Sequence, residues 1–319
     1  MWDVTMRTDT RLAGLALAAI VAFATAADAQ LTPDQARRIE AAVPQQATVK
    51  PIKSRRVLIW NTPFMDKCPH AGYCVPQGQH AMELLGRKTG AYEPVVSDDV
   101  AMYLPENLAK FDAIIFNNSN GPWIRPTEQD MSRLKDYGSD IDTVEQLLRK
   151  SLLDWVRNGG GFVAFHHAIG GNNHWPEYGE IIGASYWGHP WNEEVGVKLD
   201  EPNHPLLRAF GGENFRLAEE IFQFNDPYSR ENVRVLLSLD VANTNMTVQW
   251  VYRKDNDFAL AWIKPYGKGR VFYSAIGHRT EIWWNPPILR FYLDGIQFAM
   301  GDLDAPMEPP AKPLRGPNP

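Results

Sequence analysis

Histidines at the ends of apolar runs are the residues of this chain best suited to chemistry. Six of the eight histidines follow Ala164, namely His166, His167, His174, His189, His204 and His278. Two of them, His166 and His278, come after the runs "GFVAF" and "RVFYSA", which predict buried strands. A histidine in a loop more often bonds to nearby backbone than performs a reaction. Imidazole nevertheless titrates near neutral pH and binds divalent metals, so either chemistry is open at these strand ends.

The segment "LAEEIFQF" adds two carboxylates, Glu219 and Glu220, on a predicted strand. Side chains alternate along a strand, so only one of the two can face a given side. We expect Glu220 to join His166 and His278 as the catalytic group. These residues then act either as a metal-free acid/base set, or, with His189, as ligands of a divalent metal such as zinc. We expect His167 to point away from this set, and to support either the structure or the residues of the set.

Aromatic residues cluster near these histidines. The chain has 11 tryptophans, several of them in "HWPEY" and "SYWGHPW". Aromatic rings stack on sugar rings, although packing in the core explains such residues equally well. We expect the following residues to bind a carbohydrate substrate: Trp175, Tyr178, Trp187, His189 and Trp191.

The first half of the domain alternates strands and helices. Strands are predicted at 55–61, 92–99, 111–119 and 161–165, and helices at 77–90 and 142–157. The strands are apolar throughout, which indicates a mostly parallel sheet covered on both faces. Ligands of such sheets lie beyond the carboxyl ends of the strands, where His166 is predicted.

The second half is less regular. It contains further predicted strands, at 194–200, 220–224, 233–240, 257–265 and 269–278, and a closing helix at 285–301. We see no linker or repeat within 55–302 and predict one domain. A polar lead-in at 30–54 precedes it, and a Pro-rich tail at 303–319, for which composition favours disorder, follows it.

The N-terminus has the pattern of a cleaved signal peptide at 1–29. Arg7 and Arg11 precede the apolar run 12–25, and Ala27-Asp28-Ala29 is a small-residue cleavage site. The run is short for a membrane span, although an uncleaved anchor is the alternative. We therefore expect a periplasmic or secreted protein with no stable membrane span after cleavage.

Export bears on the two cysteines, Cys68 and Cys74, in "CPHAGYC". In an oxidising compartment a close pair favours a disulfide. A metal site that includes His70 is the alternative, but its ligand set is incomplete and its spacing unusual.

Other functions are excluded by what the sequence lacks. The formal net charge is -6 and there is no Lys/Arg-rich run, so nucleic acid is not an expected partner. The motifs GxSxG, HExxH and Walker A are missing, and no cysteine stands at a strand–helix turn. The sequence gives no indication of the oligomeric state.

Several segments follow one another in a specific order: "GGGFVAFHHA", "HWPEYGEIIGASYWGHP", "HPL", "EEIF", "GKGRVFYSAIGH" and "GIQFAMG". In this order they resemble the ThuA-like (trehalose utilisation) family, and the resemblance covers about 55–302. It implies a flavodoxin-like, three-layer α/β fold related to class I glutamine amidotransferases. In those enzymes a catalytic cysteine follows the central strand. The resemblance puts His166 near that position, so amidotransferase activity is not implied.

The resemblance also implies a role in carbohydrate metabolism. The leading hypothesis is an enzyme that acts on a sugar, a glycoside or a keto-sugar. A non-catalytic carbohydrate-binding protein is the first alternative, because a fold does not guarantee a reaction. A metal-dependent hydrolase of another substrate class is the second.

Overall fold

The computed structural model describes residues 31–61, 74–171 and 174–311 of the chain. The predicted signal peptide and Cys68 lie outside these residues, so the proposed cleavage and the Cys68–Cys74 disulfide stay predictions. The α-helices are α1 Pro33–Ala42, α2 Val75–Thr89, α3 Pro105–Leu108, α4 Glu128–Leu134, α5 Ile141–Arg157, α6 Pro176–Ile182 and α7 Pro286–Ala299. The strands are β1 Arg56–Trp60, β2 Glu93–Ser97, β3 Ala113–Asn117, β4 Gly161–Phe165, β5 Ser185–Tyr186, β6 Trp191–Leu199, β7 Phe215–Ile221, β8 Phe224–Asn225, β9 Arg234–Leu239, β10 Ala259–Tyr266 and β11 Gly269–Ser274.

A nine-stranded sheet forms the centre of the molecule, in the order β2-β1-β3-β4-β11-β10-β9-β6-β7. The strands from β2 to β11 pair in parallel. Their order corresponds to 2-1-3-4-5, which is the flavodoxin-like arrangement. The predicted α/β fold with a mostly parallel core is therefore confirmed.

The other half of the sheet is antiparallel. β10 pairs with β11 and β9, and β6 pairs with β9 and β7, each in antiparallel register. A separate two-stranded pair, β5 and β8, lies near the start of β6. The sheet as a whole is thus mixed, with the parallel strands on one side.

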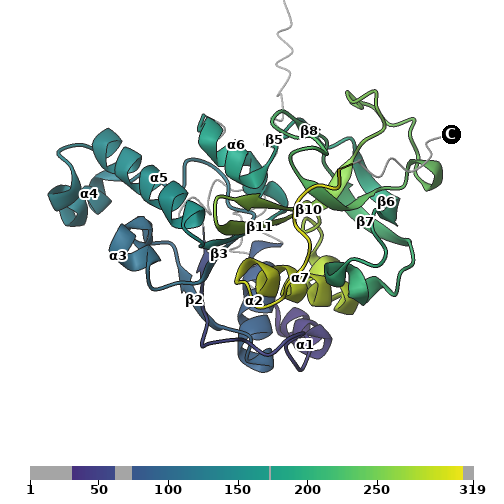
Figure 1. Cartoon of the computed structure of the whole chain (residues 1–319), viewed down its shortest axis with the longest axis horizontal. Helices are drawn as coiled ribbons and strands as arrows, with labels where there is room; N and C mark the ends of the chain where they lie inside the picture. The colour runs from purple at the N-terminus through teal and green to yellow at the C-terminus, as the bar shows by residue number, and fades with distance from the viewer. Residues whose placement is uncertain (1–30, 62–73, 172–173, 312–319) are drawn as a thin grey trace, which may run out of the picture.

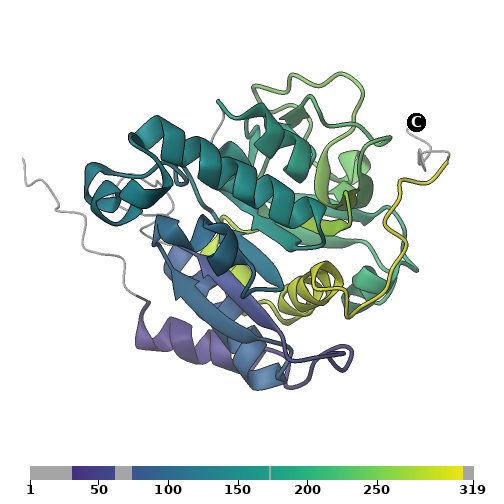
Figure 2. The ribbon, with the colours of Figure 1, turned by 60° about the vertical axis from the view of Figure 1, so that its left-hand side comes forward.

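Helices cover both faces of the sheet (Figures 1 and 2). Helices α1, α2 and α7 lie on one face, and α5 and α6 lie on the other. Each face has its own cluster of buried apolar residues. The predicted helix at 142–157 is α5, and both of its ends are capped. Its N-cap is Asp140, whose side chain accepts from Thr143 N, and Gly159, just beyond its C-terminus, has φ 120°.

The segments outside 55–302 also contact the domain. In the lead-in, Ile39 is fully buried and Thr48 N donates to Gln297 Oε1 at 2.8 Å. In the described part of the tail, the carbonyl of Pro306 accepts from His204 Nε2 at 3.0 Å. This part of the tail, for which composition favoured disorder, is therefore held against the domain.

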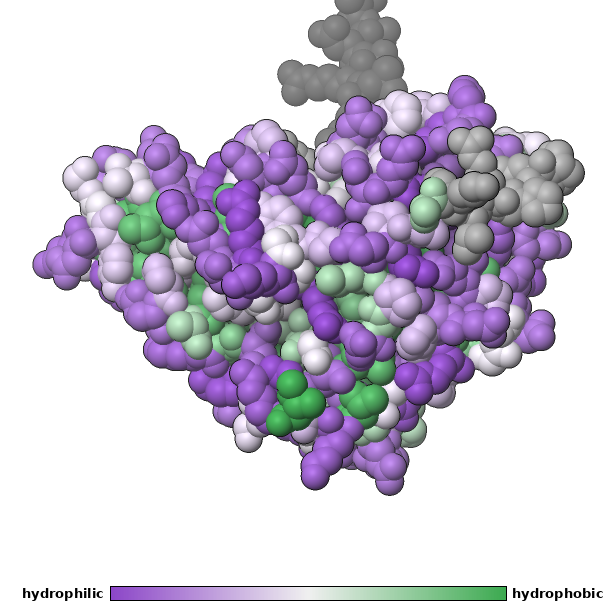
Figure 3. Space-filling model, viewed as in Figure 1, coloured by the Kyte–Doolittle hydropathy of each residue, from purple (hydrophilic) through white to green (hydrophobic). Residues whose placement is uncertain are grey.

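The surface of the face seen in Figure 3 is mainly hydrophilic, with apolar patches that are small and separate. Among the described residues, no helix is both long and apolar enough to cross a bilayer.

Candidate functional site

His166 is the first residue after β4, at the carboxyl edge of the parallel strands. It is fully buried and its φ of 47° lies in the left-handed region, which non-glycine residues seldom adopt. Its Nδ1 lies 2.7 Å from the carbonyl oxygen of Ala275. A carbonyl only accepts, so Nδ1 carries the proton and Nε2 presents a lone pair. This bond fixes both the ring and its tautomer.

Three side chains meet at that lone pair. His166 Nε2 lies 3.3 Å from Glu220 Oε2 and 3.3 Å from His278 Nδ1, and His278 Nδ1 lies 3.4 Å from Glu220 Oε2. Within the described parts of the chain, this is the one group of three or more His, Cys, Asp or Glu with ligand atoms all within 4.8 Å. The structure therefore brings together the three residues predicted to be catalytic.

Burial keeps the imidazoles of this cluster neutral. The pKa of His166 lies well below its usual value because the ring is buried, and the neighbouring histidines lower it further. Burial also lowers the pKa of His278, although Glu220 acts in the opposite direction. Neutral imidazole is the form that ligates metals.

Two buried polar residues hold the loops that carry the cluster. Asn118, with φ 54°, accepts from His167 N at 3.2 Å and donates to the carbonyl of Gly277 at 3.3 Å. Glu219 accepts from the backbone N–H groups of Gly277 and Arg279, each at 3.1 Å. As the alternation of a strand requires, Glu219 holds the backbone around His278 while Glu220 faces the cluster.

His189 lies at the outer side of the cluster. Its Nε2 is 4.0 Å from Glu220 Oε1, and 44% of its side chain is exposed. It is not one of the three residues whose ligand atoms lie within 4.8 Å, so its predicted role as a metal ligand is not supported by the geometry. Its Nδ1 bonds to the Tyr186 hydroxyl, and burial raises the pKa of Tyr186 to about 12. The hydroxyl stays protonated and can donate to Nδ1, which leaves the His189 proton on Nε2, towards Glu220.

The prediction that His167 points away from the cluster is wrong. Its ring lies 5.6 Å from the Tyr186 ring and 6.1 Å from the Phe222 ring, centroid to centroid. Phe222 also packs against His166, with centroids 4.3 Å apart. Burial lowers the pKa of His167, and Glu220 opposes this shift. The short helix at His166–Gly170 turns the chain so that consecutive histidines face the same region.

The prediction that aromatic side chains bind a carbohydrate is wrong for Trp175, Tyr178 and Trp191. Trp175 and Tyr178 are buried against each other, with rings stacked at 5.7 Å, and the Tyr178 hydroxyl donates to Ala168 O. Trp191 is fully buried and its Nε1 donates to Asn245 O. These rings pack in the core, which is the alternative that the composition left open. Of the four predicted aromatic residues, Trp187 alone is exposed.

Tyr186, Phe222 and Asn118 contribute to the site but were not among the predicted catalytic, binding or metal residues. Tyr186 stands three residues before His189, and Phe222 two residues after Glu220. Their proximity to predicted site residues was the available signal. Asn118 lies at the end of the predicted strand at 111–119, at the carboxyl edge where ligands of such sheets are expected, and this position was its signal.

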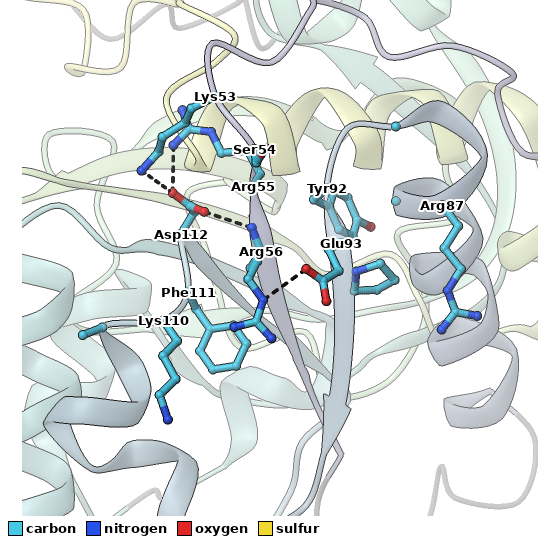
Figure 4. A pocket seen from close by; sticks show the side chains of 14 residues that line it. Lys53, Ser54, Arg55, Arg56, Arg87, Tyr92, Glu93, Lys110, Phe111 and Asp112 are labelled. Atoms are coloured by element: carbon cyan, nitrogen blue, oxygen red, sulfur yellow. Dashed lines mark hydrogen bonds and ion pairs between the residues drawn. The ribbon is translucent and has the colours of Figure 1, made fainter.

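A groove also lies at the opposite edge of the sheet, beside the amino ends of β1 and β2 (Figure 4). Its cations have partners: Lys53 and Arg55 pair with Asp112, and Arg56 pairs with Glu93. The groove has none of the histidines of the cluster, so we do not assign the chemistry to it.

The family of the protein follows from comparison with known sequences. The family model for ThuA, described as trehalose utilisation, matches residues 56–299. The chain belongs to the ThuA family. This membership gives a carbohydrate-related role at the level of the family.

A solved structure of a ThuA-like protein from Bacteroides uniformis shares the fold. It has 20% sequence identity and a TM-score of 0.55, and the match covers 79% of this chain and 94% of that chain. Another from Parabacteroides merdae has 15% identity and a TM-score of 0.48, over 78% of this chain and 90% of that one. No curated protein matches this ThuA chain.

Proposed function

We propose that this ThuA protein is an exported enzyme that acts on a sugar, a glycoside or a keto-sugar. Its reacting centre is His166, Glu220 and His278, and these residues hold a divalent metal such as zinc. Family membership supports the carbohydrate substrate, and the geometry of the three side chains supports the metal.

One observation supports the metal site most directly. Nε2 of His166 presents a lone pair, because Nδ1 bonds to Ala275 O at 2.7 Å, and it lies 3.3 Å from Glu220 Oε2. An imidazole lone pair and a carboxylate oxygen repel each other unless a proton or a cation lies between them. A second imidazole nitrogen, His278 Nδ1, converges on the same point. Two histidines and one carboxylate are a common catalytic zinc set, and a ring N–H on a backbone carbonyl is its usual support.

When bound, such a metal polarises a carbonyl or hydroxyl oxygen, or lowers the pKa of a bound water. The protein's own residues supply the rest. Phe222 closes one side of the cluster and excludes water from the His166 ring. His189, half exposed and bonded to the Tyr186 hydroxyl, is the group placed to give or take a proton at the substrate.

The direct test of this proposal is a turnover screen. The mature protein, reconstituted with zinc, is assayed on trehalose, other disaccharides, aryl glycosides and keto-sugars, together with His278→Ala and the surface control Ile52→Ala. We expect turnover in the wild type and in Ile52→Ala, and a loss of at least about 100-fold in His278→Ala. Sugar binding without turnover in any of these proteins would favour a carbohydrate-binding role. Turnover of esters or amides alone would favour a hydrolase of another class.

Export is the part of the proposal that depends on residues 1–29. The positive residues, apolar run and small-residue site support it. N-terminal sequencing of the protein expressed with its full leader tests it, and we expect a mature N-terminus near Gln30. An intact Met1 in the purified protein would contradict cleavage.

A further inference from the structure

Exposed aromatic side chains gather in one part of the molecule. Of the described residues, four large hydrophobic side chains are exposed: Ile52, Trp187, Trp250 and Tyr252. Ile52 is in the lead-in, whereas the three aromatic residues belong to two short segments, 186–189 and 250–253. Exposed aromatic rings of this kind mark binding surfaces more often than isolated apolar residues do.

Two of these rings are neighbours in space. The centroids of Trp187 and Tyr252 lie 5.3 Å apart, at an angle of 39°. They are 39% and 46% exposed, so each packs on the other and keeps part of its surface open to solvent. The pair comes from segments that are more than 60 residues apart in the sequence.

Gln223 holds the two segments together. It is fully buried, and its backbone bonds to both Trp187 N and Gly188 O, each at 2.9 Å. Its side-chain Oε1 accepts from Tyr252 N at 2.9 Å, and its Nε2 donates to Trp250 O at 2.6 Å. One buried amide therefore fixes the backbone on both sides of the ring pair. A site with this support is built into the fold.

The ring pair adjoins the histidine cluster. Trp187 is two residues before His189, and Gln223 is three residues after Glu220. Two residues of extended chain span at most about 7 Å, so the ring pair is about one sugar unit from the rim of the cluster. The adjacent Tyr186 ring stacks on His189, with centroids 5.9 Å apart, and links the two regions.

We propose that Trp187 and Tyr252 form a stacking subsite for a second sugar ring. The substrate is then a disaccharide or a longer glycoside, with its reacting ring at His166, Glu220 and His278. The apolar C–H face of a pyranose packs on an aromatic ring, while its hydroxyls stay in water. Three exposed side chains are a small surface beside the roughly 800 Å² per partner of a stable dimer, so a second copy of the chain is the less suitable occupant. This inference rests on the proposed carbohydrate function.

The test compares ring removal with ring replacement. Trp187→Ala, Tyr252→Ala, Trp187→Phe and Tyr252→Phe are prepared with Ile52→Ala as the exposed apolar control. Calorimetry measures binding of glucose, galactose and mannose and of their α- and β-linked disaccharides, trehalose included. Sedimentation measures the mass of each protein.

We expect at least one disaccharide to bind the wild type more tightly than its monosaccharides. Each alanine variant should weaken that binding at least about tenfold, whereas the Phe variants and Ile52→Ala should stay within about threefold. Monosaccharide affinity should not change in any variant.

A disaccharide affinity in the alanine variants equal to that of the wild type would overturn the subsite. So would a loss of oligomer mass in these variants with unchanged sugar binding, which would assign the rings to a contact between copies. Absence of binding by every sugar would overturn it as well. The proposed function is tested separately, by comparing turnover in the wild type and in His278→Ala. If a sugar is turned over and the ring variants have no effect, the proposed function is supported and the subsite alone is contradicted.

Discussion

Nε2 of His166 lies 3.3 Å from Oε2 of Glu220, although both atoms are acceptors. The bond from His166 Nδ1 to Ala275 O prevents the ring from relieving this contact by changing its tautomer. Burial meanwhile holds the pKa of His166 well below its usual value, so protonation of the ring is disfavoured at neutral pH. The contact therefore needs either a proton donated by His278 Nδ1 or a cation shared between the two ligands, and the proposed function takes the cation.

Glu220 and its neighbour Glu219 provide a matched pair of substitutions. Glu220→Gln removes a negative ligand, so we expect zinc affinity to fall by at least about tenfold, measured by competition with a chromophoric chelator. Glu219→Gln changes the same atoms on the next residue, but its side chain faces the 277–279 backbone. It should lower stability by about 1–3 kcal/mol and leave zinc affinity within about threefold. Equal zinc affinity in the two variants would contradict the assignment of Glu220 as the ligand.

The Tyr186 hydroxyl should matter for turnover and not for metal binding. Tyr186→Phe keeps the ring that packs on Phe222, at 5.0 Å between centroids, but removes the bond to His189 Nδ1. We expect kcat on the substrate found in the screen to fall by about 10–100-fold, with unchanged zinc content. An unchanged kcat would contradict a role for the Tyr186 hydroxyl in orienting the His189 ring.

Asn118 is expected to stabilise the site through both its side chain and its backbone. Asn118→Ala and Asn118→Gly both remove the bonds to His167 N and Gly277 O. Alanine also keeps the strain of φ 54°, whereas glycine adopts this conformation freely. Thermal unfolding should therefore show Asn118→Gly to be about 1 kcal/mol more stable than Asn118→Ala. The reverse order would indicate that the backbone conformation at this residue is not strained.

Local sequence patterns were sufficient to predict most of the strands, the longer helices α2, α5 and α7, and three site residues, whereas α3 and α4 were not predicted and the predicted strand at 220–224 is divided between β7 and β8. The apolar runs at 161–165 and 269–278 became β4 and β11, and their parallel pairing put His166 and His278 at one edge. The strand period also explains why only one of Glu219 and Glu220 faces the cluster. These features depend on spacing within a few residues, which a single sequence contains.

Features that depend on contacts between distant segments could not be predicted in this way. The burial of Trp191 depends on Asn245 and Phe258, which pack on it from more than 50 residues away. The exposure of Trp187 depends on the loop around Tyr252. Trp187 and Trp191 are only four residues apart, yet Trp187 lies at the surface and Trp191 in the core.

Buried Asp294 should make stability depend on pH. Burial raises its pKa to about 6 from 3.8, while the bond to Thr48 and the nearby Arg290 act against this shift. Between these values the unfolded state is ionised and the folded state holds a proton, so this residue's contribution to stability falls as pH rises through the interval. The loss amounts to about 3 kcal/mol and is complete above about pH 6.

Asp294→Asn cannot ionise, so it should lack this contribution. Urea unfolding of both proteins from pH 4 to pH 7 measures it, and the variant should gain stability relative to the wild type as pH rises. A difference in the free energy of unfolding between the two proteins that stays constant over this pH range would contradict the raised pKa of Asp294.

The most direct test of the central claim is the metal content of the mature protein, purified without chelator or affinity tag and compared with His166→Ala. We expect close to one equivalent of zinc or another divalent metal in the wild type and at least about tenfold less in the variant, with circular dichroism confirming that both are folded. No metal in the wild type, even after zinc is added and the excess removed, would contradict the metal site. The cluster would then be left to metal-free acid/base chemistry or to sugar binding alone.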